Sequence, residues 1–292
     1  WRRCTLCTSP PARVARPCFG DPFSGRQPDT SRFCAALRLS CSRASLVGSR
    51  ADGKFVVVEK TPDKMNVREP AGDTIVSANH FQTPGLQEDK RNQRYLEEAT
   101  SLPRFDRLTE LLADAGGTIN ATRAAEFLRD RKLPGGKFAG NGQRAALNAF
   151  IATHATVMDL TDGIFWAAAP PHQLGKFVAF DVNDFDRELP ALTIAADETL
   201  ASGEFEKARA ARKKLADGER ALKSKDAATA LTLADAAEAL NPGFYQNAAL
   251  RGRALRALGR NDEAAKAFTA ALAAHPAFLA ERQQLDGWLK SG

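Results

Sequence analysis

Between Lys54 and Ala78, apolar residues form two short runs that are typical of β-strands. Lys54–Lys60 reads KFVVVEK, with three consecutive valines after a phenylalanine and a turn-forming Asp-Gly just before it. Such a run of β-branched residues behind a turn predicts a strand. The run TIVSA at Thr74–Ala78 predicts a second short strand, which leads directly into Asn79.

Helical periodicity replaces this pattern further along the chain. In Arg104–Ala115 the apolar residues recur at helical spacing and predict a helix with one buried face. Ala121–Lys132 predicts a second helix, which ends at a Leu-Pro-Gly-Gly sequence.

Strand patterns then return over three segments. Ala149–Leu160 and Ile164–Ala169 are apolar runs separated by Thr-Asp-Gly, which predicts a β-hairpin. Gly175–Val182 predicts a third strand of the same meander. Strands, then helices, then antiparallel strands predict an α+β domain of layered sheets and helices, and not a parallel βαβ sheet.

After Pro190 the chain is rich in alanine, leucine and charged residues, which predicts helices to its end. Small residues and a proline recur there at a constant offset of 34 residues, pairing Gly218 with Gly252, Ala230 with Ala264, Ala237 with Ala271, and Pro242 with Pro276. This spacing is typical of tetratricopeptide repeats, over about Ala211–Phe278. A generic alanine-rich helical hairpin is the alternative. Two repeats are fewer than an independent solenoid needs, so we expect them to pack on the main domain or on a partner.

Composition sets the first fifty residues apart from the rest. All five cysteines lie there, at positions 4, 7, 18, 34 and 41, together with nine arginines and two aspartates. The formal charge of +6 for all 292 residues therefore comes from this head, and the remainder carries −1. Lys, Glu, Asn, Ile, Met, Tyr and His are absent from it.

Three interpretations of the head compete. It could bind nucleic acid or metal, but its cysteines lack the paired spacing of a zinc site. It could be a targeting peptide, although it has no apolar run of a secretory signal. We favour the third interpretation, in which residues 1–45 are an unreliable or disordered head. A frameshift or the edge of a gene fragment would produce such a stretch.

The remainder of the chain excludes several classes of function. No run approaches the ~20 apolar residues of a membrane span, and the near-neutral charge removes the electrostatic case for nucleic-acid binding. No phosphate-binding loop, dinucleotide fingerprint, zinc-protease motif or serine-hydrolase elbow occurs. We expect no cofactor and no metal. Localisation stays open.

Asn79 is the candidate for chemistry. A side-chain amide at the end of a strand can direct an N–H toward a developing oxyanion. The alternative is structural, since Asn is also common in the turns that follow strands. The neighbouring His80 is interpreted as a core histidine with a hydrogen-bond partner, without a catalytic role.

The order of segments adds to this interpretation. VVVEK, SANHFQTP, SLPRFDR, THATVMD and the Phe-Trp hairpin together resemble the penicillin acyltransferase-like (isopenicillin N acyltransferase) branch of the N-terminal nucleophile (Ntn) hydrolases, and more distantly the choloylglycine hydrolases. The resemblance covers about Leu46–Asp184. It implies that Asn79 helps form the oxyanion hole and that Arg104 of SLPRF supports catalysis. It also implies autoproteolysis and a small amide or acyl-thioester substrate.

The sequence departs from that family at the nucleophile. The resemblance implies an N-terminal cysteine about a hundred residues before the VVVEK strand. Cys4 and Cys7 are each followed by threonine, as the family's nucleophile is, but they lie only about fifty residues before Val56. We interpret both as coincidental, so the chain is expected to be a C-terminal portion that lacks its nucleophile and is inactive as given.

The expected organisation has four parts: the head at 1–45, a partial Ntn-hydrolase domain at 46–186, a linker helix at 187–210, and tetratricopeptide-like repeats at 211–292. The first functional hypothesis is a cysteine-dependent amidohydrolase or acyltransferase. The alternative is a protein-interaction module whose repeats bind a partner or a second copy. Nucleic-acid binding through the basic head is a third and weaker idea.

Overall fold

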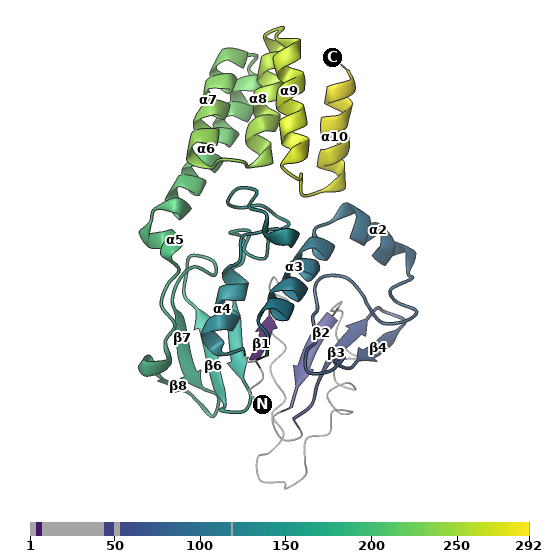
Figure 1. The fold of residues 1–292 in the computed structure, drawn as a ribbon, viewed down its shortest axis with the longest axis vertical. Coiled ribbons are helices and arrows are strands. Elements are labelled where there is room, and N and C mark those ends of the chain that lie inside the picture. The colour runs from purple at the N-terminus through teal and green to yellow at the C-terminus, as the bar shows by residue number, and fades with distance from the viewer. Residues whose placement is uncertain (1–3, 8–43, 50–52, 118, 292) are drawn as a thin grey trace.

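The computed structural model describes residues 4–7, 44–49, 53–117 and 119–291. Two antiparallel sheets lie at one end of the molecule and an array of helices lies at the other (Figure 1). Most of the head, including Cys18, Cys34 and Cys41, lies outside the described residues. The strands are β1 Cys4–Cys7, β2 Ala44–Gly48, β3 Phe55–Lys60, β4 Met65–Arg68, β5 Thr156–Asp159, β6 Ile164–Ala168, β7 Phe177–Asp181 and β8 Asp184–Glu188.

The larger sheet has the strand order β1-β5-β6-β7-β8. β5 and β6 form the expected hairpin, with Asp159 opposite Ile164 and the Asp-Gly turn between them. The strand predicted over Ala149–Leu160 is wrong for residues 149–155, which have no regular structure, since β5 begins only at Thr156. β7 continues the meander, which confirms the third predicted strand. The backbone of β1 pairs with β5 and places Cys4 opposite Asp159. This pairing does not test whether residues 1–45 arise from a frameshift or a fragment edge, so that interpretation stays a prediction.

The smaller sheet has the order β2-β3-β4, with β3 in the middle. β3 matches the predicted strand, and four of its six residues are buried. The strand predicted at Thr74–Ala78 is wrong, since this segment has no regular structure beyond an isolated bridge at Thr74. β4, which the sequence did not single out, occupies the edge of β3 instead. Arg68 of β4 then donates from Nη2 to the carbonyl of Val76 at 2.7 Å and holds the irregular segment beside the sheet.

The helices are α2 Lys90–Glu98, α3 Ser101–Asp114, α4 Ala121–Arg129, α5 Glu198–Ala201, α6 Glu204–Lys223, α7 Ala227–Leu240, α8 Tyr245–Ala257, α9 Asn261–Ala273 and α10 Leu279–Lys290. Two short 3-10 turns, η1 Pro134–Gly136 and η2 Pro190–Leu192, interrupt the loops. None of the described helices is both long enough and apolar enough to cross a membrane.

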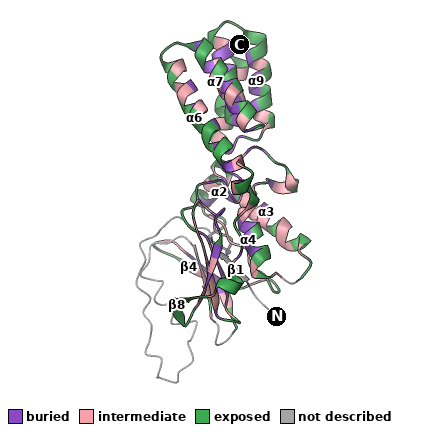
Figure 2. Ribbon diagram, turned by 90° about the vertical axis from the view of Figure 1, so that its left-hand side faces the viewer, coloured by how far each residue is buried: buried purple, intermediate pink, exposed green. Residues whose placement is uncertain are grey.

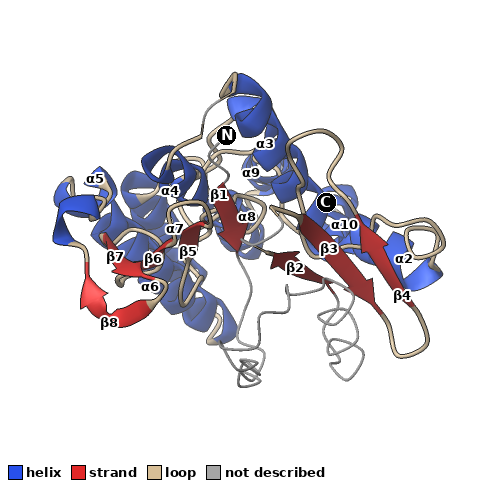
Figure 3. Cartoon of the chain, turned by 90° about the horizontal axis from the view of Figure 1, so that it is seen from below, coloured by secondary structure: helices blue, strands red, loops and turns tan. Residues whose placement is uncertain are grey.

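The main core of the sheet domain forms where α4 packs on the five-stranded sheet. Ala124, Ala125 and Leu128 of the helix contact a buried face that includes Trp166 and Phe177. The indole N–H of Trp166 donates to the Leu192 carbonyl at 2.8 Å, so its polar atom is satisfied although the ring is buried. Seen from below, the strands of both sheets lie in front of the helices (Figure 3).

Helices α6 to α10 pack as successive antiparallel neighbours, and their buried residues face the interior of the array (Figure 2). The small residues that repeat at the offset of 34 lie at these contacts. A Cβ atom on Gly218 would be 2.6 Å from Leu250 Cδ2, and one on Gly252 would be 2.5 Å from the ring of Phe268. Close helix approach therefore requires glycine at both positions. The chain is thus an α+β protein with a C-terminal helical array.

The helix contact at Gly252 gives a stability prediction. Gly252→Ala adds a methyl group against the Phe268 ring, so we expect a loss of about 1–3 kcal/mol of unfolding free energy from overpacking. Gly287→Ala is the matched control in α10, because nothing lies within 4 Å of its added Cβ. The control should gain up to about 1 kcal/mol from helix propensity. Urea denaturation of both variants measures the difference, and equal stabilities would contradict the packing argument.

Candidate functional site

The first turn of α3 holds the segment that carries Asn79. The Ser101 hydroxyl oxygen accepts the backbone N–H of Asn79 at 2.8 Å and lies 2.8 Å from Nδ1 of His80. Ser101 is fully buried and His80 nearly so. Since the hydroxyl already accepts from Asn79, its own proton is free to be donated to His80 Nδ1. One serine therefore fixes both the backbone and the imidazole of this segment.

Arg104, one turn further along α3, fixes the side chain of Asn79. Its Nη2 donates to Asn79 Oδ1 at 2.8 Å, and its Nε donates to the carbonyl of Thr100 at 3.0 Å. A guanidinium has donors only, so it selects the oxygen of the amide. The Nδ2 group of Asn79 must then face away from Arg104, and it has no hydrogen-bond partner within the described part of the chain. The arrangement leaves Asn79 with a directed N–H donor.

A buried carboxylate anchors the residues that follow. Glu59, at the end of β3, is fully buried. It accepts the backbone N–H of Gln82 at 2.9 and 3.0 Å, the backbone N–H of Thr83 at 2.8 Å and the Thr83 hydroxyl at 2.8 Å. Arg68 lies opposite, with its Nε 3.7 Å from the carboxylate. The carboxylate thus fixes the segment after Asn79 to the three-stranded sheet.

Two asparagines complete the anchoring. Asn92 of α2 accepts the Phe81 N–H at 2.8 Å and returns a bond to the Phe81 carbonyl at 3.1 Å. Asn66 of β4 donates to the Thr83 hydroxyl at 3.2 Å and to the Pro84 carbonyl at 3.0 Å. Every residue from Asn79 to Pro84 is therefore held by α2, α3 or the sheet, and the candidate donor sits on a rigid segment.

The environment of His80 favours its neutral form. Burial lowers the pKa of His80, the nearby Arg68 and Arg104 lower it further, and the Glu59 carboxylate opposes them. The edge of its ring meets Phe105, with centroids 5.3 Å apart. The bond from Ser101 also suits an unprotonated Nδ1. His80 therefore lies in the core with a polar partner, as the sequence predicted.

Arg104 is a half-buried cation. Burial lowers its pKa, Tyr95 opposes this effect, and Arg144 adds to the lowering. Guanidinium groups keep their charge in proteins, so Arg104 remains cationic. No carboxylate pairs with it among the described residues. Its charge therefore acts on Asn79 and strengthens the polarity of the amide N–H groups.

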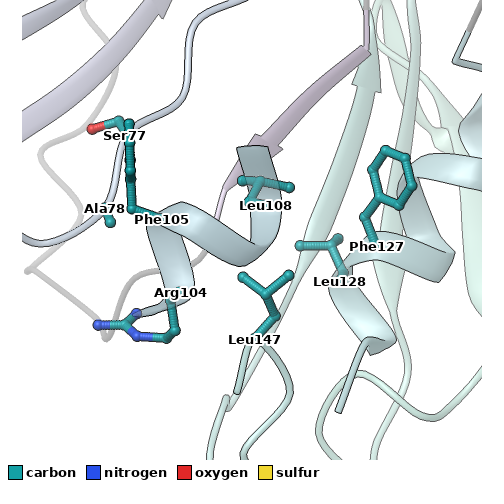
Figure 4. Close-up of a pocket in the computed structure, with 8 residues that line it drawn as sticks. All are labelled: Ser77, Ala78, Arg104, Phe105, Leu108, Phe127, Leu128 and Leu147. Carbon is teal, nitrogen blue, oxygen red and sulfur yellow. The ribbon is translucent and has the colours of Figure 1, made fainter. Parts of the chain in front are cut away.

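A small cavity of about 30 Å³ begins beside this pair. It is lined by Ser77, Ala78, Arg104, Phe105, Leu108, Phe127, Leu128 and Leu147. In Figure 4, Leu108, Leu128 and Leu147 point toward one another, and the guanidinium of Arg104 points away from them. The volume suits on the order of one water molecule. The cavity is thus an apolar recess next to a cation.

The structure brings together the two site residues that the sequence proposed, Asn79 and Arg104, although their roles stay predictions. Sequence reasoning missed Glu59, Ser101 and Asn92. Glu59 had a usable signal, because a charged residue directly after buried valines needs partners. Ser101 had one too, as part of SLPRF. No group of three or more His, Cys, Asp or Glu side chains is placed to hold a metal ion within the described ranges.

The buried imidazole makes a prediction about pH. Because the folded pKa of His80 is lowered, the unfolded chain binds a proton that the folded chain resists. The unfolding free energy should therefore fall as the pH drops through the ordinary histidine value of about 6.5. His80→Gln should show a weaker fall over this range, measured by urea denaturation at several pH values.

Asn92→Ala is the control for this experiment. It loosens the same segment by releasing Phe81, but it removes no titrating group. It should lower stability while keeping the pH slope of the unaltered chain. An unchanged slope in His80→Gln would show that His80 does not carry the effect.

Comparison with known proteins relates one part of the chain to a family. Residues 30–137 match the family model described as Acyl-coenzyme A:6-aminopenicillanic acid acyl-transferase. No curated protein and no solved structure matches the chain. The matched segment includes β3, β4, α2, α3 and α4, and with them every residue that anchors Asn79. Residues 30–137, which include Asn79 and Arg104, are therefore similar to the penicillin acyltransferase-like family.

Proposed function

We propose that this chain contributes the oxyanion-stabilising part of a cysteine-dependent Ntn-type acyl-transfer site. In the proposed reaction, a cysteine thiolate attacks the carbonyl carbon of an amide or thioester. The carbonyl electron pair moves to oxygen, and the tetrahedral oxyanion collapses to an acyl-enzyme as the amine or thiol leaves with a proton. Water or an amine then attacks the acyl-enzyme and regenerates the thiol.

The observation that carries this proposal is the orientation of the Asn79 amide. Arg104 Nη2 binds Oδ1 at 2.8 Å, so Nδ2 is the part of the amide left for another acceptor. A preorganised donor that needs no reorientation during the reaction is the arrangement that stabilises an oxyanion. The bonds from Ser101, Asn92 and Glu59 to the same segment support this interpretation, since they restrict its movement.

Arg104 acts in this proposal as a positioning residue for Asn79. It also brings a positive charge into a half-buried region, where Coulomb interactions are stronger than in water. The charge favours a site in which negative charge develops on the substrate. The apolar recess formed by Leu108, Leu128 and Leu147 would accept a small part of an apolar acyl group.

We further propose the domain organisation that this function needs. Residues 46–186 would form the Ntn-type domain with layered sheets, residues 187–210 a linker, and residues 211–292 tetratricopeptide-type repeats. The equal offset of 34 residues between the packed glycines supports the repeats. The protein would act on a small amide or acyl thioester, with neither nucleic acid nor cofactor required.

Substitution of Asn79 tests the oxyanion role. Asn79→Ala and Asn79→Asp should each lower kcat on the order of 10²–10³ with an acyl-coenzyme A thioester or a chromogenic amide. Asp keeps an acceptor for Arg104 but lacks the N–H donor. It therefore separates the two roles: full activity in Asn79→Asp would assign Asn79 a purely structural part. The assay requires a protein that carries the nucleophile.

Asn66→Asp is the matched control, because Asn66 donates to the same segment without meeting Arg104. It should change kcat far less than Asn79→Asp. Equal losses in both variants would point to disorder of the segment as the cause.

The cysteines give a separate prediction. Cys4 and Cys7 are interpreted as coincidental, so the chain as given should show no turnover that depends on them. Cys4→Ala and Cys7→Ala should leave any background hydrolysis of the thioester unchanged. Turnover that either substitution abolishes would identify a nucleophile in β1 and overturn this part of the proposal.

A further inference from the structure

One loop of the sheet domain lies along the turns of the helical array. The backbone N–H of Asn141 donates to Asn241 Oδ1 at 2.8 Å, and Asn241 Nδ2 donates to the Asn141 carbonyl at 2.9 Å. Asn241 follows α7 and is nearly fully buried. The Asn241 side-chain amide thus pairs with both the N–H and the carbonyl of Asn141, as the backbone of a neighbouring strand would. Arg131 holds the Asn141 side chain from the other side at 2.7 Å.

The loop also contacts the next turn of the array, at the position that corresponds to Asn241 in the following repeat. Gln143 is fully buried and donates from Nε2 to the carbonyl of His275 at 2.9 Å. His275 lies 34 residues after Asn241, at the corresponding place in the repeat. The loop also places Arg144 over the ring of Phe278, at 5.9 Å from its centroid. Two successive turns of the array therefore hold one loop.

Contact between Gly140 and Phe244 is the closest approach of the two parts. Gly140 has a φ of +82°, and a Cβ atom there would lie 2.6 to 2.9 Å from Phe244 Cβ, Cα and N. Because two of those atoms belong to the backbone, they cannot move as a flexible side chain would. The loop can lie on the array only with glycine at this position.

The same loop continues into the candidate site. Leu147 lines the cavity beside Arg104. The residues on either side, Ala146 and Asn148, are almost fully buried, and the Asn148 N–H donates to the Asp130 carbonyl at 2.8 Å. Asp130 in turn receives two bonds from Arg107 of α3. The wall formed by Leu147 is therefore fixed between α3 and the helical array.

We propose that the helical array sets the shape of the acyl-binding recess, with Asn241 and Phe244 as positioning residues that act through residues 140–147. The recess holds only about 30 Å³, so a small displacement of Leu147 changes it by a large fraction. The array thus determines which acyl group fits beside Arg104. This inference rests on the proposed function for the identity of the ligand, but the contacts that carry it are independent of Asn79.

Two glycine substitutions test the inference in the full chain. Gly140→Ala introduces a clash with Phe244 at a positive φ. Gly142→Ala is the matched control, since its φ of +85° gives the same backbone strain while its nearest neighbour, Arg212 Nη2, is 3.5 Å away. A second pair avoids a folding failure: Asn241→Ala removes the two-bond contact, and His275→Asn changes a residue that contributes only its backbone carbonyl to the loop.

The first measurement is amide hydrogen exchange over residues 145–150. We expect faster exchange in Gly140→Ala and Asn241→Ala than in their controls. The second is the ratio of dissociation constants for two non-hydrolysable acyl-coenzyme A thioethers, one with a short and one with a longer chain. The ratio should shift by about tenfold in the test variants, the effect of about one methylene group in a pocket.

Each outcome decides the inference. Equal exchange in test and control variants would overturn it, because the array would not hold the loop. Faster exchange with an unchanged ratio, or no binding of either thioether to the unaltered chain, would overturn the link to the acyl recess. Loss of the Asn79→Asp effect would contradict the proposed function alone, since neither exchange nor thioether binding involves an oxyanion.

Discussion

The buried carboxylate of Glu59 is the constraint on which the rest of the site depends. A carboxylate without water needs donors for its oxygens, and Gln82 and Thr83 supply them, while the Arg68 guanidinium forms an ion pair with it at 3.7 Å. The donors gain as well, because a backbone N–H that is buried without a partner costs about 1–3 kcal/mol. Since neither side can be satisfied alone, the end of β3 and the segment after Asn79 form together or not at all. The buried charge of Glu59 therefore determines where the backbone of residues 82 and 83 runs.

That path explains how one turn of α3 can orient Asn79. Once Glu59 and Asn92 fix the residues after it, the backbone N–H of Asn79 meets Ser101 and its side chain meets Arg104. Each of these partners contacts a different atom of the same residue, so rotation about either side-chain bond breaks the bond to Arg104. The direction of the Asn79 amide is thus a consequence of this anchoring. His80 follows the same rule that buried polar atoms need partners, since its neutral ring meets the Ser101 hydroxyl.

Sequence patterns predicted those parts that depend on local periodicity. β3, α3, α4 and the β5–β6 hairpin were found because their apolar residues repeat with the period of the element. The strand at Thr74–Ala78 was wrong for a reason that periodicity cannot reveal. Its run of apolar residues is short, and β4 with less typical residues competes for the same edge of β3. Asn79 was singled out by its place after a predicted strand and by a family resemblance, and Arg104 by the resemblance alone. Their contact and the anchors Glu59 and Asn92 depend on tertiary contacts between elements.

The contacts of the candidate site join residues at very different separations along the sequence. Glu59, Asn79 and Arg104 lie within one continuous stretch of chain, so the donor and its anchors can form from local pieces. The recess needs Leu147 as well, and its loop is held by Asn241, 100 residues from Asn141. Loop-closure entropy makes such a contact unfavourable until the helices of the array have packed. Asn79 and its anchors therefore lie in the sheet domain, whereas the recess beside Arg104 is completed only when the helical array is in place.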